Sequence, residues 1–364
     1  MKTRNGHATL FDQKAAIKLR VSSSSNHTSA FMVPFSKLAL LAISLPLASV
    51  LTTSTEAIEL GLPIDCTLGK NCFFQQFVDV DPSSKAVDPF CSAYTYDKHK
   101  GTDLRVRSMA DVVSGFSVTA VADGTILRVR DGEADHLVRT QEDFELVAGK
   151  ECGNGLVLQL AEDYEIQYCH LRKGSLVVAP GQAVQIGDKL GEVGASGLAQ
   201  FPHVHITLRK SGKLVDPLTG RLVSSGCKRE FDKSRSLFSE SVVAKVDPNV
   251  PDILSLGLSG QPVRHSSLVE MGPPSRLSVN DSLFVAWGWL TRLNKGDQLR
   301  IALKNNRAET IIDNTSEPLE SNKATYSAYA GKRQKLPKGS YTVTLSVLRR
   351  DEVVASKSEV IVLE

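Results

Sequence analysis

Gly155-Leu-Val-Leu-Gln-Leu160 leads through Glu-Asp-Tyr into Glu165-Ile-Gln-Tyr168, so that two short apolar runs stand on either side of a polar link. This pattern predicts a β-hairpin, because short strand-like runs separated by a few polar residues are typical of paired antiparallel strands. Cys152 and Cys169 flank the runs and would face each other at the open end of the hairpin, within the Cα separation that a disulfide spans. We therefore predict a Cys152–Cys169 disulfide.

The same kind of pattern continues over residues 116–224. Short apolar alternations broken by glycine predict an antiparallel, all-β domain. Residues 131–150 are charged and interrupt the strands, so we expect a surface excursion there, whereas residues 58–98 are expected to form an irregular lead-in. The expected strands are Ser117–Val121, Gly124–Val129, Leu156–Leu160, Glu165–His170, Ser175–Val178, Lys189–Val193 and His203–Leu208.

Strand signals resume beyond a charged connector. Residues 228–257 contain Asp-Pro-Asn-Val-Pro-Asp and predict a linker between a first domain over 58–227 and a second over 258–364. About seven strands in about 105 residues are typical of an immunoglobulin-like β-sandwich, which makes the whole chain mostly β. We consider a binding or supporting role and a purely stabilising one equally compatible with this sandwich. Its expected strands are Ser282–Leu290, Gln298–Leu303, Thr325–Tyr329, Ser340–Leu348, Val353–Ala355 and Glu359–Leu363.

Residues 1–57 differ in composition from the rest. Lys37 precedes the apolar run Leu38–Leu51, and a polar stretch then ends at the small residue Ala57, as in a secretory signal. Pro46 interrupts the run, which is short for the roughly 30 Å of hydrocarbon that a permanent span crosses. A membrane anchor or a buried helix is therefore the weaker interpretation. We expect Met32 as the start and cleavage after Ala57.

The net charge of +3 comes from this export segment, because residues 58–364 hold 37 Lys and Arg against 38 Asp and Glu. Such a balance indicates neither nucleic acid nor an anionic membrane as a partner. We expect no stable membrane anchor after signal cleavage, and the oligomeric state stays open.

All six cysteines lie within residues 66–227, and an even number in an exported chain favours disulfides. Cys66, Cys72, Cys91 and Cys227 are expected to tie the ends of the first domain together, in an order that the residues do not decide. A zinc site made of cysteines is the weaker alternative, because no two of them have Cys-x2-Cys spacing.

Four of the six histidines in residues 58–364 fall in three motifs, His99-Lys-Gly-Thr-Asp103, Tyr168-Cys-His170-Leu and Phe201-Pro-His203-Val-His205. Catalytic zinc takes three protein ligands from His and Asp or Glu and keeps a fourth position open. On a straight strand His99 and Asp103 would lie about 13 Å apart, so we expect a bend at Gly101. His203 and His205 would share one face of a strand. A lone His-x-His pair is as often a surface or core feature, and only the combination of motifs is informative.

In this order the motifs resemble those of the lysostaphin/LytM-type zinc metallopeptidases, which are peptidoglycan endopeptidases with a compact antiparallel β fold (the duplicated hybrid motif fold). The resemblance covers roughly residues 87–220 and includes His-x-Gly-x-Asp, Tyr-x-His-Leu and the final His-x-His. It also includes Thr119–Ile126, Gly181–Gly191 and the Gly194–Gly197 turn. The Phe-Pro before His203 departs from the commoner Gly-Pro.

The resemblance implies one zinc ion per chain, held by His99, Asp103 and His205, with His170 and His203 as catalytic residues and no other cofactor. It implies an endopeptidase that hydrolyses peptide cross-links or bridges of peptidoglycan with a metal-activated water, in the periplasm or after secretion. Either Tyr94 or Tyr96 could donate to the developing oxyanion. One alternative is a zinc-retaining wall-binding or regulatory module that activates another hydrolase, and a weaker one is an exported protease acting on Gly-rich proteins.

Overall fold

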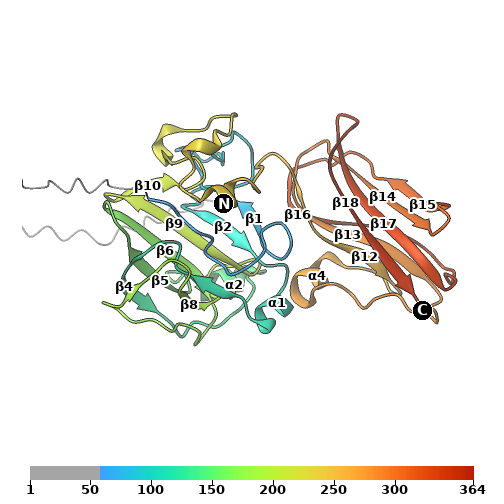
Figure 1. Cartoon of the computed structure of the whole chain (residues 1–364), viewed down its shortest axis with the longest axis horizontal. Coiled ribbons are helices and arrows are strands. Elements are labelled where there is room, and N and C mark those ends of the chain that lie inside the picture. Colours follow the sequence, from blue (N-terminus) through green and yellow to red (C-terminus); the bar gives the residue numbers. More distant parts are fainter. Residues whose placement is uncertain (1–57) are drawn as a thin grey trace, which may run out of the picture. The chain divides into compact units, whose positions relative to one another are not determined.

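The structure is a computed structural model that describes residues 58–364, and these residues lie within a single compact unit. The expected export segment, its start and its cleavage site fall outside the described residues. Among residues 58–364, no helix combines the length and the apolar character that crossing a membrane requires. The described part is mostly β (Figure 1).

A nine-stranded antiparallel sheet forms the first part of the fold, in the order β1-β2-β9-β6-β5-β4-β7, with β10 paired to β9 and β11 to β10. Its strands are β1 (Phe73–Gln76), β2 (Thr102–Arg105), β4 (Gly124–Arg130), β5 (Asn154–Gln159), β6 (Tyr164–Leu171), β7 (Ala183–Val184), β9 (His203–Lys210), β10 (Lys213–Asp216) and β11 (Arg221–Leu222). A second, two-stranded sheet pairs β3 (Ser117–Thr119) with β8 (Lys189–Glu192). The antiparallel all-β prediction for this region is confirmed.

The predicted hairpin is β5 and β6, with Leu158 opposite Ile166 and Leu156 opposite Tyr168. These side chains are buried on one face of the sheet, and the buried hydroxyl of Tyr168 accepts a hydrogen bond from the Val121 amide at 2.9 Å. The sheet therefore has one apolar face against a core and one face left for other side chains.

The strand expected over Ser175–Val178 is wrong. The segment is a loop whose Leu176 and Val178 pack half-buried against the core, and its backbone makes a bond from Val177 N to Leu190 O. The apolar residues do cover the core, but they do so from a loop. The strand that pairs with the sheet in this region is β7, which pairs with β4. The lead-in over 58–98 is irregular as expected except for β1.

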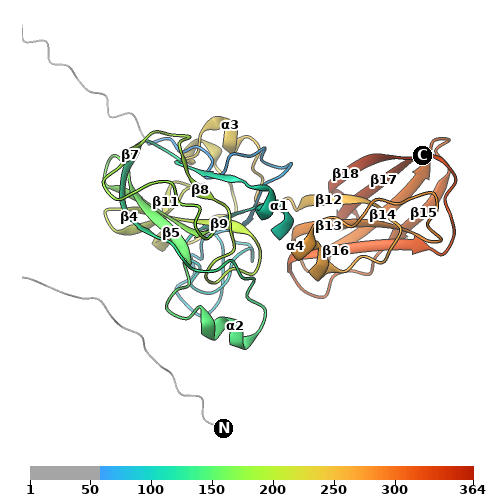
Figure 2. The same cartoon turned by 90° about the horizontal axis from the view of Figure 1, so that it is seen from below.

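The excursion at 131–150 carries a short exposed helix, α2 (Gln141–Leu146). Its N-terminus is capped by Thr140, whose hydroxyl accepts from the Asp143 amide while Asp143 accepts from the Thr140 amide. This reciprocal cap stabilises a helix too short to persist alone. Figure 2 shows α2 standing away from the sheet on its loop.

The first half of the expected connector packs on the core of the first part of the fold. Phe238, Val242 and Val246 are buried in that core, and Phe238 meets Phe74 edge to face. The connector contains η2 (Lys233–Arg235) and α3 (Glu240–Val243), and the other short helices of the first part are α1 (Met109–Ser114) and η1 (Val223–Ser225).

The last part of the chain contains two antiparallel sheets, ordered β12-β13-β16 and β15-β14-β17-β18. Their strands are β12 (Asp252–Ser259), β13 (Phe284–Leu293), β14 (Gln298–Asn305), β15 (Thr310–Thr315), β16 (Lys323–Lys332), β17 (Gly339–Arg349) and β18 (Glu352–Leu363), and α4 (His265–Met271) lies between β12 and β13. Leu290, Leu303 and Val343 from both sheets share one buried apolar cluster.

Three strand expectations are corrected here. β12 begins at Asp252, inside the expected connector, and a register shift between Ile253 and Ser255 hid its alternation. β15 was not predicted, although Thr310–Ile312 is a short β-branched run. The two short strands expected near the C-terminus are one strand, β18, whose exposed positions, such as Val360, are also apolar.

All six cysteines form disulfides. The predicted pair Cys152–Cys169 is confirmed, and the remaining bonds are Cys66–Cys72 and Cys91–Cys227. Cys91–Cys227 does tie the two ends of the first domain, across a sequence separation of 136, whereas Cys66–Cys72 closes a local loop with a separation of 6.

Candidate active site

His99, Asp103 and His205 converge, with one ligand atom from each lying within 4.8 Å of the others. Asp103 on β2 stands directly opposite His205 on β9 in the antiparallel register. The closest atom pairs are His99 Nε2 to Asp103 Oδ1 at 3.1 Å, His99 Nε2 to His205 Nδ1 at 3.1 Å, and His205 Nδ1 to Asp103 Oδ1 at 2.9 Å. Two adjacent strands and the segment before one of them therefore supply all three groups.

His99 reaches this site through a turn. Its amide donates to Tyr96 O at 3.0 Å, and Lys98 within the turn has a φ of 65°, a left-handed conformation that the Lys98 amide supports by donating to Asp79 Oδ2. The expected bend at Gly101 is also present. The turn was not predicted, because no Gly or Asn marks position 98.

Gly101 is required for a second reason, which is space. A Cβ atom at this position would lie 2.1 Å from Ile206 O and 2.7 Å from His205 Nε2. Neither distance is tolerable, and Ile206 O belongs to the β9 backbone. The absence of a side chain at residue 101 is what lets the approach to β2 lie directly against the His205 ring.

The donor set fits zinc. A tetrahedral ion at about 2.0–2.2 Å from its ligands separates the ligand atoms by about 3.3–3.6 Å, close to the separations above. His99 Nδ1 donates to Phe77 O at 2.6 Å, which places the proton of the neutral ring on Nδ1 and turns the lone pair of Nε2 toward Asp103. Two lone pairs at 3.1 Å repel each other unless a cation or a proton lies between them.

The charge at the site favours a cation. Burial by itself would raise the pKa of Asp103, but the neighbouring His99, His203 and His205 lower that pKa well below its usual range. The carboxylate is consequently ionised and buried without an arginine or lysine partner among the described residues. A buried carboxylate whose close partners are histidine rings alone is costly when those rings are neutral, and a bound metal ion removes that cost.

His170 and His203 lie beside the three converging groups, with ring centroids 4.5 Å apart. His170 Nδ1 donates to Ser196 O and His203 Nδ1 donates to Phe201 O, each at 2.7 Å. These bonds place the proton on Nδ1 and leave Nε2 of each ring as a proton acceptor. His203 Nε2 lies 3.7 Å from Asp103 Oδ1.

Burial lowers the pKa of both rings, that of His203 to about 4 and that of His170 well below its usual range. Both are therefore neutral near pH 7. His170 also has a φ of 64°, which a non-glycine residue rarely adopts. Its amide donates to Cys152 O at 2.9 Å, so the disulfide-bonded end of the hairpin supports this strained position.

A cleft of about 300 Å³ adjoins Asp103 and His203 and is walled by Tyr96, Phe144 and Phe201. Tyr96 is half-exposed and stacks on the His99 ring, with centroids 4.4 Å apart. Tyr94 faces away, since it is buried and its hydroxyl donates to Asn294 Oδ1. Of the two tyrosines, only Tyr96 is thus in place to act at the site.

The cleft wall also includes a residue that no sequence motif marks. Phe144 belongs to α2, in the excursion that was expected to be plain surface. The signal that could have found it is a single aromatic residue in a charged, exposed segment. Phe201 stacks on His203, with centroids 4.4 Å apart, and the buried Arg105 guanidinium lies 5.0 Å from the Phe201 ring centre.

Comparison with known proteins gives a family match to Peptidase family M23 over residues 97–217. An uncharacterised metalloprotease of Haemophilus influenzae is 34% identical over 132 residues, which are 35% of this chain and 22% of the relative. The chain thus spans about a fifth of the length of this curated relative.

Two solved structures were also found. The catalytic domain of lysostaphin from Staphylococcus simulans is 20% identical and covers 33% of this chain and 77% of its own, with a TM-score of 0.24. The catalytic domain of the prophage-encoded M23 protein EnpA from Enterococcus faecalis is 20% identical and covers 40% and 87%, with a TM-score of 0.28. Likeness at these TM-scores adds nothing to the family match.

The matched residues contain all three converging groups and both neighbouring histidines. The chain therefore carries a metallopeptidase domain of peptidase family M23, over residues 97–217, in which the group of two histidines and one aspartate is intact.

Proposed function

We propose that this protein is a zinc-dependent endopeptidase that hydrolyses peptide cross-links or bridges of bacterial peptidoglycan. The observation that carries the proposal is the convergence of His99, Asp103 and His205 beside two neutral histidines at an open cleft. The family match supports the reaction class. Three disulfides are typical of proteins outside the reducing cytosol, which supports a periplasmic or secreted location.

In this proposal His99 Nε2, Asp103 Oδ1 and His205 Nδ1 hold one zinc ion. When bound, zinc lowers the pKa of water and polarises a carbonyl group. Phe77 O keeps the His99 ring oriented by accepting its Nδ1 proton, and Thr207 Oγ1 lies 2.9 Å from His205 Nε2. Both contacts restrict the rings to the orientation that a metal requires.

His170 and His203 move the protons. With Nδ1 bonded to a carbonyl oxygen, each ring presents Nε2 to accept a proton from the attacking water and to return it to the leaving amine. Between these two transfers the protonated ring stabilises the negative charge that develops on the scissile carbonyl oxygen. The hydroxyl of Tyr96 supplies a further donor at the same cleft.

The test is incubation of the purified protein with sacculi and mass spectrometry of the released muropeptides, with and without a chelator. The wild type should release cleaved peptides, and both the chelator and His205→Ala should abolish the release. A zinc-loaded protein that releases no muropeptides, but increases release by a second hydrolase, would instead identify an activator. Cleavage of Gly-rich proteins without muropeptide release would identify a protease of a different substrate class.

We also propose that the domain expected over 258–364 is an immunoglobulin-like sandwich with a binding or supporting role, and that it extends back to Asp252 so as to include β12 as its first strand. Taken in chain order as A to G, its strands form sheets A-B-E and D-C-F-G. This differs from the constant-type immunoglobulin order only in the sheet to which the fourth strand belongs. Deletion of this domain should leave hydrolysis of soluble muropeptides intact if its role is binding to intact wall.

A further inference from the structure

The sheet face that carries His205 continues beyond the metal ligands. Along β9, the side chains of His205, Thr207 and Arg209 alternate onto one face. Directly opposite them on β6 stand Cys169, Gln167 and Glu165 in turn. Residues directly opposite in an antiparallel pair point to the same side, so these six side chains share the face of the candidate active site.

The same register extends across two further strands. Val157 on β5 stands opposite Gln167, and Arg128 on β4 stands opposite Val157. Arg128 therefore lies on the face of His205, three strands away from it. Neighbouring strands are about 4.8 Å apart, so β4 lies about 14 Å from β9 across the sheet.

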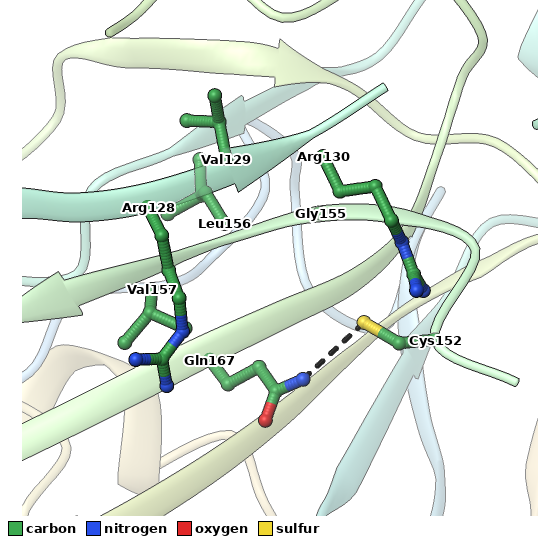
Figure 3. Close-up of a pocket in the computed structure, with 8 residues that line it drawn as sticks. All are labelled: Arg128, Val129, Arg130, Cys152, Gly155, Leu156, Val157 and Gln167. Carbon is green, nitrogen blue, oxygen red and sulfur yellow. Dashed lines mark hydrogen bonds between the residues drawn. The ribbon is translucent and has the colours of Figure 1, made fainter. Parts of the chain in front are cut away.

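A hollow of about 270 Å³ occupies this part of the face, beside the Cys152–Cys169 disulfide. Figure 3 shows Arg128 and Arg130 reaching from one strand toward Gln167 and Cys152, with Val157 beside Arg128. The Gln167 amide nitrogen lies 3.4 Å from Cys152 Sγ, and its oxygen faces the Arg209 guanidinium at 3.4 Å. The walls are thus cationic and the floor is apolar.

The hollow has an excess of positive charge. Glu165 is the acid that faces it, at 3.5 Å from Arg128 and 3.8 Å from Arg209. Arg130 donates from Nε to Gly153 O at 2.6 Å and has no carboxylate within 4.0 Å among residues 58–364. Arg128 and Arg130 line the hollow, and Arg209 contacts Gln167 from outside its lining. Among the described residues, these three guanidinium groups have one carboxylate between them, which leaves an excess of two positive charges.

We propose that this hollow is a carboxylate-binding subsite for the peptide that crosses the active site. Arginine binds a carboxylate through two parallel N–H donors, and Arg128 and Arg130 are exposed at the rim to do so. An extended peptide advances about 3.3–3.6 Å per residue, so the bound carboxylate belongs about four residues from the scissile bond. This inference rests on the proposed peptidase function.

The experiment compares a cross-linked muropeptide that has free carboxylates with the same compound converted to carboxamides. Its readout is the ratio of kcat/KM for the acid to kcat/KM for the amide. A charged hydrogen-bonded pair at an exposed site changes binding by about tenfold, so the wild-type ratio should be about ten. In Arg128→Gln/Arg130→Gln the ratio should fall to about one.

Arg221→Gln is the matched control, because Arg221 lies on β11 and donates to Ser225 O, away from the hollow. It should keep the wild-type ratio. A wild-type ratio near one, or a ratio that the double variant leaves unchanged, overturns the subsite while leaving the peptidase proposal in place.

Failure of the proposed function has a different signature, namely no hydrolysis of either compound. In that case fluorescence anisotropy with the two labelled compounds still decides the subsite. Tighter binding of the acid that is lost in the double variant supports it, and equal binding of acid and amide overturns it.

Discussion

Gly101→Ala is the most direct test of how the chain builds its metal site. The new Cβ would lie 2.1 Å from Ile206 O, whereas carbon and oxygen in ordinary contact stay about 1 Å farther apart. Because Ile206 O is backbone and pairs β9 with β2, relief requires the two strands to separate or the 99–103 segment to move. Either movement displaces His99 or Asp103 relative to His205.

Relief of this contact needs a displacement of about 1 Å, whereas metal–ligand distances in working sites vary by only about 0.2 Å. We therefore expect zinc affinity to fall by at least 10- to 100-fold, the loss usually seen when ligand orientation is disturbed. Overpacking in the sheet should also lower the free energy of unfolding of the metal-free protein by about 1–3 kcal/mol. Competition titration with a chromophoric chelator measures the first quantity, and urea denaturation in chelator measures the second.

Gly61→Ala is the matched control. A Cβ at Gly61 would meet the flexible tip of Ile186 at 3.3 Å, and Ile186 is exposed and able to move. This variant should keep wild-type zinc affinity and stability within measurement error. If Gly101→Ala bound zinc as tightly as the wild type with an unchanged free energy of unfolding, the steric reasoning about residue 101 would be refuted.

Three further outcomes are expected. His203→Ala should keep one zinc per chain by elemental analysis but lose about 10²–10⁴ in kcat, because the ring moves protons rather than holding the metal; loss of the metal would contradict this role. Replacing both Cys152 and Cys169 by serine should cost about 3 kcal/mol in urea denaturation, given the sequence separation of 17, and unchanged stability would show that the hairpin needs no crosslink. Burial raises the pKa of Asp216 to about 6, although Thr219 donates two hydrogen bonds to its carboxylate. Between about pH 4 and pH 6 the folded protein therefore holds a proton that the unfolded chain has lost. The stabilisation from this group is present at low pH and is lost as the pH rises. The free energy of unfolding of the wild type relative to that of Asp216→Asn should consequently fall by up to about 3 kcal/mol from pH 4 to pH 7. A difference that does not depend on pH would show that Asp216 does not titrate in this way.

Local patterns in the sequence predicted those features whose partners are close in the chain. The β5–β6 hairpin and its disulfide follow from two apolar runs and two cysteines within eighteen residues of each other. The strand predicted over Ser175–Val178 rested on the same kind of pattern and was wrong, because apolar alternation also occurs where a loop covers a core. Alternation reports burial on one side, and burial does not require a paired backbone.

The sequence by itself determined which groups are able to do chemistry, because the His-x3-Asp and His-x-His motifs limit the metal ligands to a few side chains. Only the tertiary structure decided how they meet. The opposition of Asp103 and His205, the turn at Lys98 and the sharing of one face by Arg128 and His205 depend on which strands are neighbours. The physical reason is that strand order arises from contacts across more than a hundred residues, and residue spacing along a strand carries no record of the strand beside it.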